Sequence, residues 1–201
     1  MNKLVVATRN RGKLVEIKKM LGESEIGIEV LSLGDYPDMP ETVEDGVTFE
    51  QNAVKKAVEV SKYTGLLAMA DDSGLEVDFL GDKPGVYSAR FAGDNATNEE
   101  NNKKLLEMMK GVKWENRTAR FKCVMAICIP NKKVYTAEGV CDGYILDEPR
   151  GDKGFGYDPL FYYPEFKKTF AELDMYEKNK VSHRSKAFKE SLKILKEILL
   201  K

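Results

Sequence analysis

The chain has 201 residues, with 32 basic and 33 acidic side chains, a formal net charge of -1 and a hydrophobic fraction of 42%. The balanced charge disfavours a general binder of nucleic-acid polymers or of membrane surfaces, and the apolar fraction supports a real core. No apolar run is long enough to span a bilayer, and the N-terminal segment is expected to be too short for a signal peptide. The length predicts one large domain or two lobes that share a sheet.

The first elements predicted are a strand, a polar loop and a helix. The run Leu4–Ala7 is entirely apolar, which is typical of a strand covered on both faces. The loop Thr8–Lys13 follows, and then comes one helical face, Leu14, Ile17 and Leu21. Such a loop brings backbone N–H groups and Lys13 to a helix N-terminus, where anions bind well. The Walker spacing is absent and lysines are common at helix starts, so phosphate binding competes here with an ordinary helix start.

A second strand is predicted at 28–33, and an acidic loop containing Glu44 leads to the next helix. Thr48 begins this helix, with Gln51 placed to complete a capping box. Its buried stripe is expected to be Phe49, Ala53, Ala57 and Val60. Asn52 and Lys56 lie one turn apart beside the stripe, and they either point into a cleft or form a solvated edge.

Two adjacent carboxylates, Asp71 and Asp72, lie between the apolar runs 66–69 and 75–80. This pattern predicts that a strand ends here and that the chain turns at Ser73 and Gly74. Successive strand side chains point to opposite faces, so the two carboxylates are expected in different environments. A turn-forming role and a functional role, in which one carboxylate binds a hard cation at a strand end, both fit the pattern.

The next part of the chain is predicted to alternate between loops, one helix and a hairpin. The segment 84–93 is a loop rich in glycine and aromatic residues, and Thr97 and Glu100 form the capping box of the following helix. Residues 119–129 and 133–140 are expected to be two long strands around a hairpin turn, and 144–146 continues the sheet. The three cysteines, which lack a metal-site spacing, are expected to be reduced core thiols: Cys123, Cys128 and Cys141.

The last third of the chain carries two segments with unusual composition. The loop 150–159 has three glycines around Phe155 and Tyr157, which suits close approach to a ligand as well as a plain connection. The final helix is expected to begin after Ser182 as its N-cap, with the apolar face Phe188, Leu192, Leu195 and Leu199. His183, the only histidine, and Arg184 then occupy the first turn, where cations oppose the helix dipole. A cation in this position needs a compensating partner. This departure from local helix preferences favours a functional role, and the alternative is a surface arginine whose unfavourable interaction costs little.

Six of these segments, in this order along the chain, resemble the inosine triphosphate pyrophosphatase family, the RdgB-like pyrophosphatases of non-standard purine nucleotides. Each motif is weak alone, and the set is specific because it covers nearly the whole chain without a departure at a position expected to be catalytic. The motifs are Thr8-x-Asn10-x-x-Lys13, Thr48-Phe49 with Asn52-Ala53 and Lys56-Ala57, Ala70-Asp71-Asp72-Ser73-Gly74, Pro84-Gly85-Val86-Tyr87-Ser88-Ala89-Arg90, Gly154-Phe155-Gly156-Tyr157-Asp158-Pro159 and Ser182-His183-Arg184.

The resemblance implies an α/β fold: a long, twisted mixed β-sheet flanked by helices, as one domain over 1–201 with two lobes and a central active-site cleft. It also implies a homodimer, and the reduced cysteines separately indicate a cytoplasmic protein. The implied reaction is Mg²⁺-dependent hydrolysis of purine nucleoside triphosphates (ITP, dITP and XTP) to the monophosphate and pyrophosphate. Such an enzyme removes deaminated purines from the nucleotide pool.

The resemblance also implies a role for each matching residue. Asp72 is the expected proton acceptor, and Glu44 and Asp72 are the expected Mg²⁺ ligands. Asn10, Lys13 and Lys56 are expected on the triphosphate and Phe155 on the base by stacking. The base pocket is expected to contain Asp158, Lys178, Ser182, His183 and Arg184. The remaining expected substrate contacts are Thr8, Arg9, Arg11, Gly12, Ser73, Gly156 and Tyr157.

Base selection then has a physical account. Lys178 and Arg184 carry donors only, which match O6 of hypoxanthine or xanthine and oppose the amino group of adenine. The account leaves the rejection of guanine open. Three alternatives are a Maf-like pyrophosphatase of modified pyrimidine nucleotides, a nucleotide sensor without turnover, and a phosphotransfer enzyme with an aspartyl nucleophile. The ending Ser182–Arg184 argues against the first, and the presence of Glu44 and Asp72 argues against the second.

Overall fold

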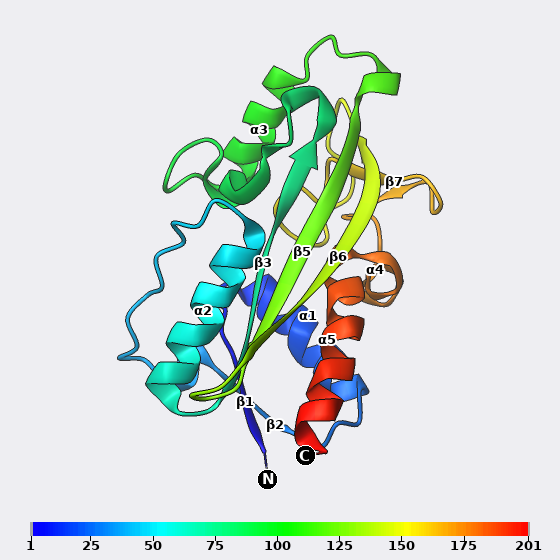
Figure 1. Cartoon of the computed structure of the whole chain (residues 1–201). Helices are drawn as coiled ribbons and strands as arrows, with labels where there is room; N and C mark the ends of the chain where they lie inside the picture. Colours follow the sequence, from blue (N-terminus) through cyan, green and yellow to red (C-terminus); the bar gives the residue numbers. More distant parts are fainter. Residues whose placement is uncertain (1, 201) are drawn as a thin grey trace. The chain divides into compact units, whose positions relative to one another are not determined.

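The computed structural model describes residues 2–200, which form a mixed, twisted β-sheet with flanking helices (Figure 1). The strands are β1 Lys3–Val6, β2 Glu29–Ser32, β3 Leu67–Val77, β4 Lys83–Pro84, β5 Thr118–Cys128, β6 Val134–Ile145, β7 Phe161–Tyr163 and β8 Lys168–Thr169. The α-helices are α1 Arg11–Glu23, α2 Phe49–Thr64, α3 Asn98–Met108, α4 Met175–Val181 and α5 His183–Leu199. Four short 3₁₀ turns are η1 Leu33–Asp35, η2 Asp78–Leu80, η3 Gly85–Arg90 and η4 Trp114–Asn116.

The chain folds into two compact units, and β3, β5 and β6 each contribute to both. The first unit comprises 1–72, 123–139 and 184–201, and its strand order is β2-β1-β3-β5-β6, with β1 parallel to both neighbours. The second unit comprises 73–122 and 140–183, with the order β3-β5-β6-β7-β8 and β4 antiparallel to β3. The predicted mixed sheet with flanking helices is confirmed, while the single domain with a central cleft stays a prediction.

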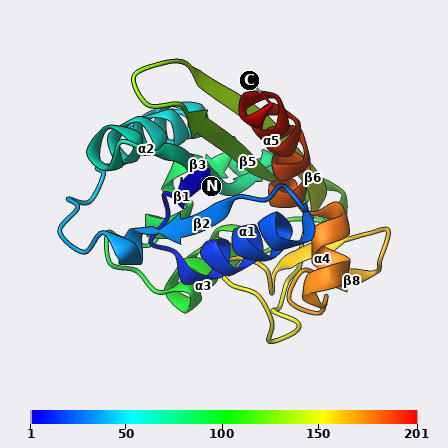
Figure 2. The ribbon, with the colours of Figure 1, turned by 90° about the horizontal axis from the view of Figure 1, so that it is seen from below.

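In the first unit, α1 and α5 cover one face of the sheet and α2 covers the other (Figure 2). Strand alternation assigns the side chains, because every second residue faces the same layer. The core beneath α1 and α5 consists of Leu4, Val6, Met69, Cys123, Met125 and Ile127 from the strands with Ile17, Met20, Leu21, Ala187, Phe188 and Leu195 from the helices. The stripe predicted for α2 is confirmed as buried: Phe49, Ala53, Ala57 and Val60.

The second unit has an aromatic core. The Phe121 ring lies 4.5 Å from the Phe161 ring and 5.7 Å from the Phe170 ring, centroid to centroid. The predicted capping box of α3 is confirmed, since Thr97 accepts from the Glu100 N–H and Glu100 accepts from the Thr97 N–H. The three cysteines are buried thiols outside any disulfide, as expected. Among the helices of residues 2–200, none combines the length and apolar character needed to cross a membrane.

Two local predictions were wrong, and one short helix was missed. The strand predicted to end at Asp71 continues to Val77, because Leu75 and Val77 are fully buried and extend the apolar pattern past Gly74. At the start of α2, Gln51 accepts from the Val47 N–H rather than completing a box with Thr48. The short helix α4 was not anticipated, although Asp174 and Glu177 form a capping box for it.

A buried arginine connects several turns of the second unit. Arg117 is 1% exposed, and its guanidinium donates to the backbone oxygens of Met109, Val112, Ile145 and Leu146 at 2.6–3.2 Å. These carbonyls belong to the end of α3, the turn after it and the end of β6. One side chain therefore donates to four backbone acceptors in separate turns and holds these turns together.

We expect Arg117→Ala to lower the free energy of unfolding by about 3–5 kcal/mol, because buried acceptors lose a charged donor. Arg120→Ala is the matched control. Arg120 is 34% exposed and pairs with Asp78, whose side chain is 42% exposed, so its loss should cost less than about 1 kcal/mol. Urea unfolding of both variants measures the difference, and equal losses would contradict the role assigned to Arg117.

Candidate active site

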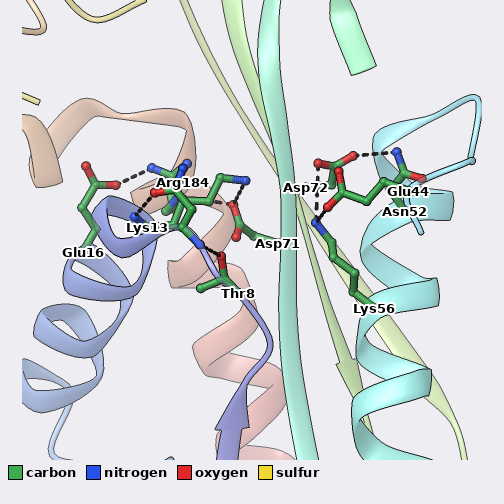
Figure 3. A network of polar contacts seen from close by, with 10 residues as sticks. Thr8, Lys13, Glu16, Glu44, Asn52, Lys56, Asp71, Asp72 and Arg184 are labelled. Carbon is green, nitrogen blue, oxygen red and sulfur yellow. Dashed lines mark hydrogen bonds and ion pairs between the residues drawn. The ribbon is translucent and has the colours of Figure 1, made fainter. Parts of the chain in front are cut away.

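The two carboxylates in the middle of β3 point to opposite faces of the sheet (Figure 3). Asp71 faces α1 and α5, and Asp72 faces α2. The expectation that they occupy different environments is confirmed, because the strand continues through both residues and alternates its side chains. Each carboxylate is the centre of a polar cluster within the first unit.

The Asp72 cluster consists of Asp72, Asn52, Lys56 and Glu44. Asn52 donates from Nδ2 to Asp72 Oδ2 at 3.0 Å, and its Oδ1 accepts from the Gly46 N–H, which fixes the orientation of the amide. The Lys56 ammonium lies 3.6 Å from Asp72 Oδ1 and 2.6 Å from Glu44 Oε1. The predicted pair on α2 therefore points inward, and the solvated-edge interpretation of Asn52 and Lys56 was wrong.

Burial raises the pKa of Asp72, and the attraction of Lys56 only partly opposes this shift. For Lys56, burial alone would lower the pKa, but the carboxylates of Asp72, Asp71 and Glu44 outweigh it and the pKa is raised. Asp72 is thus a carboxylate with increased basicity beside a lysine that stays charged. This combination suits a proton acceptor near anionic groups.

The Asp71 cluster consists of Asp71, Lys13, Arg184 and Glu16. Lys13 Nζ lies 3.1 Å and Arg184 Nε lies 3.4 Å from Asp71 Oδ2, and a second ion pair joins Arg184 Nη1 to Glu16 Oε2. The Asp71 side chain is fully buried, which alone would raise its pKa, but Lys13 and Arg184 outweigh burial and hold the pKa far below its usual range. Asp71 is therefore a permanently charged anchor for two cations.

The loop Thr8–Lys13 is tied into the start of α1. Asn10 caps the helix by accepting from the Lys13 N–H at 3.1 Å, and Thr8 Oγ1 accepts from the Asn10 N–H at 3.2 Å. Arg9 donates to the Met39 backbone oxygen, while Arg11 and Gly12 form the first turn of α1. Lys13 thus belongs to the first turn of α1, and anion binding at this helix N-terminus stays a prediction.

Arg184 has protein partners in this structure. We predicted that a cation in the first turn of α5 needs a compensating partner and assigned that role to a bound base. Glu16 and Asp71 compensate it instead, and together they raise its pKa despite complete burial. Contact between Arg184 and a base stays a prediction, but the helix dipole no longer supports it.

Within the second unit, Asp158 organises a third cluster with Lys178 and Phe155. Asp158 Oδ2 accepts from Lys178 Nζ at 2.6 Å and from the Phe155 N–H at 2.9 Å, and all but a few per cent of both charged side chains is buried. Lys178 Nζ also lies 4.9 Å from the centroid of the Phe155 ring. The residue before Phe155 must be glycine, because a Cβ at Gly154 would collide with Asp158 Oδ2 and its φ is +74°.

The other predicted site residues have more varied positions. His183 is 4% exposed and stacks on Phe121 at 4.7 Å between ring centroids, so its ring belongs to the aromatic core of the second unit. Ser182 has extended backbone between α4 and α5, and Ser73 continues β3 directly after Asp72. Tyr157 is 4% exposed, and its hydroxyl donates to a backbone oxygen inside the same unit.

The donors fit a divalent metal ion of the kind the resemblance implies. Among residues 2–200, no group of three or more His, Cys, Asp and Glu side chains could hold a metal by itself. Glu44 and Asp72 nevertheless bind the same ammonium, so two oxygen donors already converge on one positive charge. Mg²⁺ commonly takes one or two carboxylates and completes its shell with phosphates and water.

Comparison with known proteins identifies the family. The sequence model of the Ham1 family matches residues 4–194. The chain belongs to the Ham1 family. Similar proteins include a dITP/XTP pyrophosphatase from Desulforamulus reducens, 54% identical with 98% of each chain covered, and one from Geobacter sulfurreducens, 56% identical with 93% of each covered. The solved structure of a HAM1 protein from Coxiella burnetii is 41% identical with a TM-score of 0.88, covering 98% of this chain and all of that one.

These matches confirm the resemblance that the six motifs indicated. They also confirm the fold class, since the Coxiella HAM1 protein superposes over nearly the whole chain. The Maf-like alternative receives no support from the family match or from the relatives.

The sequence did contain a signal for Glu16, which we missed. Glu16 lies four residues before Met20 and one before Ile17, on the face of α1 that is buried. A carboxylate on an apolar helix face needs a cationic partner, since an unpaired buried charge is very costly. Its partner Arg184 is 168 residues away, so the pattern predicts the need for a partner but not its identity.

The two neighbouring carboxylates should differ in their effect on stability. Asp71→Asn should lower the free energy of unfolding at pH 7 by about 3 kcal/mol, because buried Lys13 and Arg184 lose a charged partner. Asp72→Asn should change it by less than about 1 kcal/mol or raise it, because the charge removed is one that burial disfavours. Chemical denaturation of the two variants measures this contrast, and the reverse order would contradict the environments described for them.

Proposed function

We propose that this Ham1-family protein hydrolyses nucleoside triphosphates with a deaminated purine base, ITP, dITP and XTP, to the monophosphate and pyrophosphate. The observation that carries the proposal is the Asp72 cluster in a chain whose relatives, at 54% and 56% identity, are dITP/XTP pyrophosphatases. Removal of deaminated purines from the nucleotide pool follows from this activity. A nucleotide sensor without turnover is disfavoured because Asp72 and Glu44 are both present and both form ion pairs with the Lys56 ammonium.

The first unit would bind the triphosphate. Its positive groups are Lys13 at the N-terminus of α1 and Lys56 on α2, both with side chains only 12–13% exposed. Charge in a partly buried site interacts strongly with phosphate oxygens and stabilises the negative charge that develops during hydrolysis. Thr8, Asn10 and the first turn of α1 would contribute hydroxyl, amide and backbone donors at the same helix end.

Glu44 and Asp72 would hold Mg²⁺, which when bound supplies positive charge against the phosphate oxygens. Asp72 would also take the proton of the water that attacks the α-phosphorus, and pyrophosphate would leave with the electrons of the broken phosphoanhydride bond. The position of Asp72 supports this role, because its carboxylate is buried beside the Lys56 ammonium, where the phosphates would bind. Asn52 would hold Asp72 in position through its 3.0 Å hydrogen bond.

The second unit would bind the base. Phe155 would stack on the purine, and Lys178 would donate to O6, held by Asp158 at 2.6 Å so that its ammonium has a fixed place. A donor at that place matches hypoxanthine and xanthine and opposes the amino group of adenine. Contacts from Ser73, Gly156, Ser182, His183 and Arg184 are further predictions of the resemblance, as is a homodimer. A cytoplasmic location is predicted from the cysteines, and the absence of a nucleic-acid partner from the balanced charge.

The experiment that tests the function is a screen of nucleoside triphosphates with and without Mg²⁺, measuring both monophosphate and pyrophosphate. We expect dITP, ITP and XTP to be cleaved far faster than dATP, dTTP and UTP, and chelation by EDTA to stop cleavage. Release of inorganic phosphate in place of pyrophosphate would contradict the proposal. Preference for dTTP or UTP would indicate the Maf-like activity.

Asp72→Asn should reduce kcat for dITP by at least about 10²-fold, because it removes a metal ligand and the proton acceptor together. The fold should persist, since Asn keeps an acceptor for Asn52 and Lys56 keeps Glu44. Steady-state kinetics with circular dichroism as the folding control check this. Turnover within threefold of wild type would exclude Asp72 as the proton acceptor.

Three lysine variants separate phosphate binding from base selection. Lys13→Ala and Lys56→Ala should lower kcat/KM for dITP and dGTP by the same factor, because the phosphates of the two substrates are identical. Lys178→Ala should change the dITP:dATP ratio instead, because it removes a donor aimed at the base. Measuring kcat/KM for dITP, dGTP and dATP in each variant distinguishes these outcomes. A changed base ratio in Lys13→Ala or Lys56→Ala would assign those lysines to the base.

A further inference from the structure

The segment Pro84–Arg90 is one of the six motifs, and the functions assigned above leave it without a role. In the structure it forms the end of β4 and the turn η3. Ser88 is 8% exposed, and its hydroxyl donates to the Gly85 oxygen at 2.6 Å and accepts from the Leu75 N–H at 2.9 Å. Leu75 belongs to β3, so Ser88 fastens η3 to the strand of the second unit that continues from Asp72.

The backbone oxygen of Ser88 holds the segment that follows Phe155. Tyr157 donates from its hydroxyl to the Ser88 backbone oxygen at 2.8 Å. The ring is 4% exposed, and burial raises the pKa of Tyr157, so the hydroxyl keeps its proton and remains a donor at neutral pH. Its side chain therefore points into the second unit and makes a structural hydrogen bond there.

A second hydrogen bond holds the peptide group between Gly156 and Tyr157. Asn102 on α3 donates from Nδ2 to the Gly156 oxygen at 3.0 Å, and its Oδ1 is buried without a hydrogen-bond partner among the described residues. Its neighbour Asn101 bonds to η3, donating to the Ala89 oxygen and accepting from the Ala92 N–H. Helix α3 is thus tied both to η3 and to the loop that carries Phe155.

The loop requires such anchors because of its glycines. Gly154 and Gly156, on either side of Phe155, have φ values of +74° and +62°. Glycine samples many backbone conformations, so the sequence around Phe155 does little by itself to fix the direction of the ring. Two bonds to adjacent residues, one at the Gly156 oxygen and one at the Tyr157 hydroxyl, remove that freedom before a ligand arrives.

We propose that Ser88, Asn102 and Tyr157 form a brace that sets the position of Phe155 for base binding. Tyr157 and Asn102 are then positioning residues, and the earlier expectation that Tyr157 is a substrate contact is replaced for its side chain. The proposal rests on the proposed function, since it assigns Phe155 to the base. It also gives the Pro84–Arg90 motif a role, because Ser88 is the fixed point of the brace.

Two variants with small structural cost test the brace. Tyr157→Phe removes only the hydroxyl, and Asn102→Leu removes the donor together with the unpaired buried oxygen, which should leave global stability nearly unchanged. Each should raise KM for dITP about threefold to tenfold, the range for one lost hydrogen bond, with kcat within twofold. Each should also lower the dITP:dATP ratio of kcat/KM, because a displaced Phe155 ring shifts the base relative to the Lys178 donor. Tyr63→Phe, at a tyrosine that is 50% exposed on α2, is the matched control and should leave all three values unchanged.

Hydrogen exchange provides a measurement that is independent of activity. Amides of residues 154–158 should exchange faster in both brace variants than in wild type, while those of β5 should not change. Faster exchange with unchanged KM and unchanged base ratio would overturn the positioning role, as would unchanged exchange. Failure of the wild-type enzyme to release pyrophosphate from dITP would instead overturn the proposed function. This measurement uses the wild-type enzyme alone, so it is separate from the test of the brace.

Discussion

Alternation of side chains along β3 is the constraint on which the first unit depends. Because the strand stays extended through Asp71 and Asp72, two neighbouring carboxylates must face different layers. Asp71 meets two cations, and its pKa falls, whereas Asp72 meets a neutral amide and a shared lysine, and its pKa rises. The same type of side chain thus has two roles: Asp71 is a fixed anchor on one face, and Asp72 is a basic carboxylate on the other.

Features that depend on neighbouring residues could be predicted from the sequence. The stripe of α2, the capping box at Thr97, the hairpin at 130–132 and the separation of Asp71 from Asp72 follow from periodicity and side-chain chemistry. The continuation of β3 could not be predicted, because Ser73 and Gly74 have the composition of a turn. The contacts that keep the strand extended are tertiary: pairing with β5 and β4, and the bond from the Leu75 N–H to Ser88.

Arg184 illustrates a second limit. Its place in the first turn of α5 conflicts with the helix dipole, and the sequence correctly indicated that it needs a partner. Local rules give no partner for it, because Glu16 lies 168 residues away. Arg117 shows the same limit. An arginine next to a strand is expected to have an exposed side chain, but this one is buried because it donates to four backbone oxygens. Buried cations of this kind are visible only once the fold brings their acceptors together.

The charges beside β3 also explain why such a site would need a metal ion. The two clusters contain three cations, Lys13, Lys56 and Arg184, and four carboxylates, Glu16, Glu44, Asp71 and Asp72. Each cation is already paired with a carboxylate, so a triphosphate would bring several negative charges to groups whose positive charge is already neutralised. Because like charges in a partly buried site repel strongly, binding becomes favourable only if further positive charge enters with the phosphates. A divalent ion held by Glu44 and Asp72 would supply that charge.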